Sequence, residues 1–150
     1  MTGILDTKSE PQFAPIATTK RRHPHILLAE DDRQMRSLLA ETLAREGYHV
    51  ILCKNGWELV SQLRSIILGG QGHGDIDAVV SDIRMPGVTG LEVLESGTGK
   101  RVFPPMILIT AFGDAGTHTM ALEYGAAAIL DKPFDIDELL RELKAIAPLQ

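Results

Sequence analysis

A strict alternation of short apolar runs with amphipathic segments constrains the fold more than any other feature of the sequence. Short apolar runs bounded by turn residues are typical of interior strands, whereas apolar residues spaced three and four apart indicate helices. The expected strands are residues 25–29, 48–53, 78–82, 106–110 and 126–130. Five strands alternating with five helices predict an α/β protein with a parallel sheet covered on both faces, a doubly wound three-layer sandwich.

The ends of the expected helices carry recognisable signals. Gly47 is the expected stop of the first helix, whose predicted apolar face comprises Met35, Leu38, Leu39, Thr42 and Leu43. Asn55 with Glu58, and Asp135 with Glu138, have the spacing of capping pairs, so the second helix is expected to run from Asn55 to about Leu68. The fourth is expected to start near Asp114 and to end near Gly125.

Charged and hydroxyl side chains stand where these strands end. Glu30 and Asp31 follow the first strand, Asp82 ends the third, Thr110 ends the fourth and Lys132 follows the fifth. In a parallel sheet these ends share one edge, where open α/β sheets place their ligands. Each residue has a purely structural alternative, such as a helix N-terminus for the acids, but their coincidence at four strand ends favours one pocket.

The chemistry of this pocket is that of a metal and a phosphoryl group. Crowded carboxylates raise one another's pKa unless a cation neutralises them, and oxygen ligands favour a hard ion such as Mg²⁺. A hydroxyl and an ammonium add a donor and a positive charge for a phosphoryl group. Asp82 ends a buried strand, four residues before the Pro86-Gly87 turn, and is the expected phosphoryl acceptor.

Four motifs together resemble the receiver domain of two-component response regulators. They are Ile26-Leu27-Leu28-Ala29-Glu30-Asp31-Asp32, Ser81-Asp82-Ile83-Arg84-Met85-Pro86-Gly87-Val88-Thr89-Gly90, Ile109-Thr110-Ala111 and Asp131-Lys132-Pro133-Phe134. The resemblance covers roughly residues 25–147. It implies a flavodoxin-like fold with sheet order 2-1-3-4-5, in a receiver domain of residues 25–150 after a flexible tail of residues 1–24.

The resemblance also assigns roles to the pocket residues. It implies transfer of a phosphoryl group from a histidine kinase to Asp82, with Mg²⁺ held by Glu30, Asp31, Asp82 and the backbone carbonyl of Arg84. Such a protein would assist its own phosphorylation and also its own dephosphorylation, which is slow. It would not be an enzyme that turns over a substrate.

The same resemblance makes Thr110 the switch hydroxyl and Lys132 the partner of the phosphoryl group, with a Lys132–Pro133 bond that is usually cis in the family. One departure stands out. Ile129 occupies a position where family members usually carry an aromatic residue, and Tyr124 is not equivalent to it. We therefore expect the signal to pass through the loop after the fourth strand and the helix that follows.

Charge and composition bound the location and partners. Residues 1–24 carry a net charge of +2 and residues 25–150 a net charge of −7, which sum to −5. An acidic body argues against direct nucleic-acid binding. The single cysteine, Cys53, and the absence of an apolar run of about 20 residues favour a cytoplasmic protein without membrane contact. The expected partners are a sensor histidine kinase or phosphotransfer protein and a separate downstream protein. A homodimer through the fourth helix, fifth strand and fifth helix is also possible.

Two other function classes share this topology. A flavodoxin-like binder of nucleotides or small molecules would need a hydroxyl- or glycine-rich phosphate loop after the first strand, where Glu30 and Asp31 stand instead. A phosphatase-type hydrolase with an aspartyl nucleophile would need a second acid two residues after Asp82, where the sequence has Arg84. A turnover assay with phosphate esters distinguishes the hydrolase from a receiver.

Overall fold

The computed structural model describes residues 23–67, 76–99, 103–111 and 115–149 of the chain. Its strands form one parallel sheet in the order β2-β1-β3-β4-β5, which confirms the predicted fold class. The strands are β1 (His25–Ala29), β2 (His49–Cys53), β3 (Ala78–Asp82), β4 (Met106–Thr110) and β5 (Ala128–Asp131). The first, third and fourth match the predicted bounds, whereas β2 begins one residue later and β5 is shifted toward Lys132.

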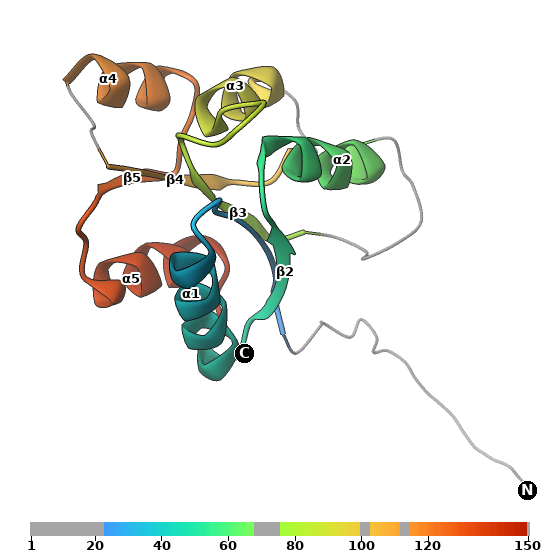
Figure 1. Cartoon of the computed structure of the whole chain (residues 1–150), viewed down its shortest axis with the longest axis vertical. Helices are drawn as coiled ribbons and strands as arrows, with labels where there is room; N and C mark the ends of the chain where they lie inside the picture. Colours follow the sequence, from blue (N-terminus) through green and yellow to red (C-terminus); the bar gives the residue numbers. More distant parts are fainter. Residues whose placement is uncertain (1–22, 68–75, 100–102, 112–114, 150) are drawn as a thin grey trace, which may run out of the picture.

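Helices cover both faces of the sheet, so the molecule has three layers (Figure 1). One face is covered by α1 (Arg33–Glu46) and α5 (Ile136–Ile146). The other face is covered by α2 (Gly56–Ile67), α3 (Gly90–Gly97) and α4 (Ala115–Glu123). Leu68 and Asp114, at predicted helix ends, lie outside the described residues, as do residues 1–22 of the predicted tail.

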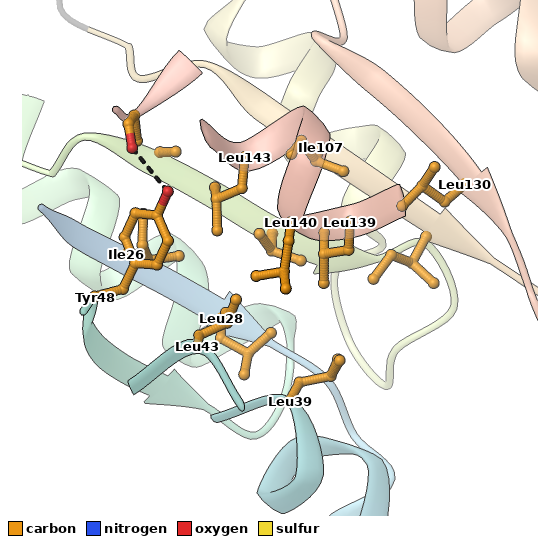
Figure 2. Close-up of a cluster of buried hydrophobic side chains, with 14 residues drawn as sticks. Ile26, Leu28, Leu39, Leu43, Tyr48, Ile107, Leu130, Leu139, Leu140 and Leu143 are labelled. Carbon is orange, nitrogen blue, oxygen red and sulfur yellow. Dashed lines mark hydrogen bonds between the residues drawn. The ribbon is translucent and has the colours of Figure 1, made fainter. Parts of the chain in front are cut away.

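The α1–α5 face packs a continuous apolar core against β1, β3 and β4 (Figure 2). Leu39 and Leu43 of α1 and Leu139 and Leu143 of α5 belong to this one cluster, and all four are buried. Tyr48, directly before β2, lies in the same cluster and donates its hydroxyl hydrogen to the carbonyl of the residue after α5, at 2.8 Å. This bond joins segments that lie 99 residues apart in the sequence.

The predicted apolar face of α1 is only partly correct. Met35, Leu39 and Leu43, each four residues apart, face the core, whereas Leu38 is 56% exposed. Residues 38 and 39 differ by one position, which is about 100° around a helix. Burial of Leu39 against the sheet therefore turns Leu38 toward solvent.

The helix ends follow the expected local chemistry. Gly47 ends α1 with φ +117°, a left-handed conformation that favours glycine. Asp135 and Glu138 form the predicted capping box of α5, and Asn55 Oδ1 accepts the Glu58 amide at 2.9 Å. Because these caps fix where α2 and α5 begin, they also fix the loops that enter them from the carboxyl edge of the sheet.

Candidate functional site

The sheet topology brings the predicted site residues together at one edge. Glu30 follows β1, Asp82 and Thr110 are the last residues of β3 and β4, and Lys132 follows β5. Glu30, Asp82 and Thr110 are buried, with exposed fractions of 1%, 5% and 2%. They are the polar residues that follow the apolar interiors of β1, β3 and β4, so the strands that build the core also place these groups.

Lys132 is the centre of the polar contacts at this edge. Its Nζ lies 2.9 Å from Asp82 Oδ2 and 3.1 Å from Glu30 Oε1, so one ammonium bridges two buried carboxylates. Its backbone amide donates to the Thr110 carbonyl at 2.7 Å, which ties the loop after β5 to the end of β4. The Lys132–Pro133 bond is cis, as predicted.

The electrostatics of the pocket depend on both burial and charge pairing. Burial, and the nearby Asp82 charge, raise the pKa of Glu30 to about 7 against the opposing effects of the Asp32 amide and Lys132. Burial lowers the pKa of Lys132, but its hydrogen bonds and charge interactions with Asp82 and Glu30 outweigh burial and leave that pKa above its usual value. Lys132 is therefore a permanent cation beside a carboxyl group that titrates near neutral pH.

Three carboxylates gather where a cation would be needed. Oxygens of Glu30, Asp31 and Asp82 all lie within 4.8 Å of one another, with Asp31 exposed and the other two buried. The donor set is all oxygen, and it combines buried charge with one open side. These residues fit a hard divalent ion that keeps part of its water shell, as Mg²⁺ does.

The loop after β1 is held by contacts that the sequence pattern did not reveal. The Asp32 amide donates to Glu30 Oε2 at 3.1 Å. The Asp32 side chain caps α1 by accepting a hydrogen bond from the Met35 amide. From α1, Arg36 Nη1 donates to the Glu30 carbonyl at 2.8 Å. Arg36 therefore orients the backbone of the acidic pair, but an arginine on a helix has no spacing signature that marks such a role.

The β3–α3 loop, residues 83–89, closes the other side of the pocket. The Arg84 amide donates to Asp82 Oδ1 at 3.1 Å, so both oxygens of Asp82 have donors. Further along, the Gly90 amide donates to the Ile83 carbonyl at 3.0 Å, and Thr89 with Glu92 forms a capping box for α3. This Thr-x-x-Glu box was not among the predicted caps, although its spacing is typical of a helix start.

Ile129, the departure from the family pattern, lies in β5 and packs partly buried against the α2–α3–α4 side of the sheet. Tyr124, directly after α4, packs partly buried against the same cluster. The two side chains thus reach the same cluster from different segments, Ile129 from within β5 and Tyr124 from the turn before it.

The fold is that of a flavodoxin-like α/β domain, a doubly wound sandwich. Its charged pocket lies at the carboxyl edge of the sheet, where Lys132 bridges an acidic cluster. The chain belongs to the response regulator receiver domain family, whose family model matches residues 26–144. It is thus a receiver domain of the two-component type. Such domains generally signal rather than catalyse turnover, and they bind Mg²⁺ at an acidic pocket.

Relatives of known name support this membership. The transcriptional regulatory protein TcrA of Mycobacterium tuberculosis is 36% identical over 122 residues, which are 81% of this chain and 45% of TcrA. CpxR of Escherichia coli is 34% identical over 121 residues, 81% of this chain and 48% of CpxR. The chain thus spans about half the length of the curated relatives it matches.

Solved structures agree on the fold. The non-phosphorylated HemR receiver domain of Leptospira biflexa has a TM-score of 0.70 at 30% identity. The match covers 85% of this chain and 96% of that receiver-domain chain. The receiver domain of the Francisella response regulator 1452 has a TM-score of 0.73 at 22% identity, over 83% of this chain and 96% of its own.

Among the described residues, no helix is long and apolar enough to cross a membrane.

Proposed function

We propose that Asp82 accepts a phosphoryl group from a histidine kinase or a phosphotransfer protein, and that the resulting change is passed to a separate protein. The observation that carries this proposal is the position of the Asp82 carboxylate, 5% exposed at the end of β3, with Lys132 Nζ 2.9 Å away and two further acids beside it. A structural acid needs one partner, whereas this one stands in a cluster suited to a cation and a phosphate.

The chain's own residues do the work of positioning and neutralising charge. A carboxylate oxygen of Asp82 forms a bond to phosphorus while the phosphorus–nitrogen bond of the donor histidine breaks, and the imidazole nitrogen leaves with that electron pair. Lys132 turns its ammonium from the carboxylate to the oxygens of the incoming group. Such in-line transfer depends mainly on orientation and charge neutralisation.

Glu30, Asp31, Asp82 and the backbone carbonyl of Arg84 would hold Mg²⁺, which supplies positive charge to the transferring oxygens. The proposal rests on the acidic cluster and on the Arg84 amide contact, which fixes the start of the loop that carries this carbonyl. Without a cation, the phosphoryl group on Asp82 would carry about −1.5 to −2 charge in place of the carboxylate's −1, beside the two acids Glu30 and Asp31.

The added charge would act on Thr110 and then on α4. Thr110 is 2% exposed at the end of β4, one strand away from Asp82 in the sheet. A shift of its hydroxyl toward the phosphoryl oxygens would pull the loop after β4 and the first turn of α4. With Ile129 in β5, this path operates without rotation of an aromatic side chain.

The surface formed by α4, β5 and α5 is the proposed site for the downstream protein or for a second copy of this chain. We expect signalling through protein contacts rather than direct nucleic-acid binding, since residues 25–150 carry a net charge of −7 against +2 in residues 1–24.

Intact-mass measurement after incubation with Mg²⁺ and a small phosphodonor tests the proposal. We expect one phosphate adduct on the wild type, none in Asp82→Asn, and an undiminished adduct in the matched control Asp77→Asn, an acid at the opposite edge of the sheet. Lack of an adduct on the wild type, or its survival in Asp82→Asn, would overturn the proposal. Steady turnover of phosphate esters would instead favour a hydrolase.

A further inference from the structure

Trp57, the only tryptophan of the chain, sits in the first turn of α2 and is 64% exposed. An indole that remains so exposed does not serve mainly to fill the core. Its ring nevertheless has one specific contact. A Cβ added to Gly87 would overlap the ring, so the indole lies directly against the backbone of that glycine.

Gly87 belongs to the β3–α3 loop, five residues after Asp82. Its φ of +84° is left-handed, a conformation that most side chains disfavour, so the loop needs glycine here for two independent reasons. Beside it, a Cβ at Gly56 would overlap the Val88 carbonyl. The first turn of α2 therefore presses on two successive residues of the loop.

This turn of α2 is a fixed platform. The Glu58 amide donates to Asn55 Oδ1 at 2.9 Å and the Lys54 amide donates to Glu58 Oε1 at 2.7 Å, so two hydrogen bonds hold the start of the helix. Leu59, two residues after Trp57, is fully buried and anchors the helix on the sheet. A ring carried on such a platform can restrain a loop without moving itself.

We infer that Trp57 is a positioning residue for the phosphoacceptor pocket, holding the β3–α3 loop so that the Arg84 backbone faces Asp82. The link to the pocket is short: Arg84 lies three residues before Gly87, and its amide is bonded to Asp82 Oδ1. The inference rests on the proposed function where it concerns Mg²⁺, because the Arg84 carbonyl is a proposed ligand.

Hydrogen exchange in metal-free protein tests the restraint itself. In Trp57→Ala we expect the Arg84 and Gly90 amides, which bond to Asp82 and Ile83, to exchange about tenfold faster than in the wild type. Trp57→Phe keeps a ring over Gly87 and should restore most of the protection. The matched control Leu52→Ala removes a side chain that is 48% exposed on β2, outside this contact, and should leave both rates unchanged.

A Mg²⁺ titration followed by amide shifts tests the consequence for the site. We expect the dissociation constant to rise about threefold to tenfold in Trp57→Ala, to return toward the wild-type value in Trp57→Phe, and to stay unchanged in Leu52→Ala. Unfolding midpoints should be nearly equal for all four proteins, since Trp57 and Leu52 are both exposed. A loss of affinity with no loss of stability separates positioning from a merely structural role.

The outcomes distinguish the two claims. Unchanged exchange at Arg84 and Gly90 in Trp57→Ala, or an equal increase across the amides of β3 and β4, overturns the role of Trp57. A wild type that neither binds Mg²⁺ nor takes a phosphate adduct overturns the proposed function, whatever the exchange rates are.

Discussion

The helices α4 and α5 flank β5 from opposite sides (Figure 1), but they are attached to the molecule in different ways. Helix α5 begins with a capping box and buries Leu139, Leu140 and Leu143. Within Ala115–Glu123, α4 has Ala121 as its one buried residue, and its Met120 and Leu122 are 43% and 60% exposed. Because a buried leucine contributes about 1.5–3 kcal/mol, α5 is held far more strongly by apolar burial.

A polar contact adds to the attachment of α4. His118 Nε2 lies 3.0 Å from Asp131 Oδ1, at the end of β5 and directly before Lys132. Both side chains are partly exposed, 32% and 52%, and a contact of this kind contributes only a few tenths to about 1 kcal/mol. Helix α4 is thus attached to the residue next to the pocket by a bond that a small charge change could break.

The two sides of β5 therefore suit different tasks. A helix with three buried leucines keeps the sheet and the Lys132 loop in place, whereas one whose single buried side chain is an alanine is held less by apolar burial and can move at lower cost. This asymmetry supports the proposal that the signal leaves through α4, without an aromatic residue at position 129 of β5.

The difference in apolar burial between α5 and α4 predicts a large difference in stability when a leucine is removed from each helix. Leu143→Ala in α5 should lower the free energy of unfolding by about 2–5 kcal/mol, because it opens a cavity in the α1–α5 core. Leu122→Ala is the matched change in α4, and we expect it to stay within about 0.5 kcal/mol of the wild type because that side chain is 60% exposed. Urea unfolding of both variants measures the difference, and similar losses in the two would show that α4 is anchored as firmly as α5.

The second effect separates apolar from charged contributions to stability. The pKa of Glu30 rises from 4.5 to about 7 on folding, mainly through burial, so between these values the folded state binds more protons than the unfolded state. The free energy of unfolding in metal-free protein should therefore fall as pH rises from about 5 to 7, by an amount on the order of 1 kcal/mol or more.

Two variants isolate this pH dependence. Glu30→Gln cannot titrate and should flatten the fall, whereas Leu143→Ala should lower stability by a similar amount at every pH. Urea midpoints measured at several pH values in the presence of a chelator give the slopes. The same slope in Glu30→Gln as in the wild type would assign the pH dependence to other groups.

The convergence of the pocket was predictable because it follows from topology. In a parallel sheet the ends of β1, β3, β4 and β5 meet at one edge, so Glu30, Asp82, Thr110 and Lys132 could be placed together from the sequence alone. The bounds of β1, β3 and β4 were equally accessible, since each is a buried apolar run with a polar residue at or directly after its end.

What the sequence did not reveal are contacts between distant segments with no periodic signature. The exposure of Leu38 was missed because spacings of three and four allow two neighbouring stripes on α1. The Arg36 contact with the Glu30 carbonyl, the Trp57 ring over Gly87 and the His118–Asp131 pair depend on how loops and helices meet in space. They become visible only in the folded chain.

The smallest expected effect is the response of α4 and α5 to a phosphate mimic in the pocket. A phosphate mimic bound with Mg²⁺ should shift the amide resonances of Thr110, Ala111 and residues 115–118, and raise exchange in α4, while the amides of α5 from Leu139 to Leu143 stay unchanged. His118→Gln, which weakens the contact with Asp131, should raise α4 exchange by a few fold before any mimic is added, because the lost contact contributes less than about 1 kcal/mol. Shifts confined to the loops around Asp82, or equal changes in α4 and α5, would contradict a signal that leaves through the weakly attached helix.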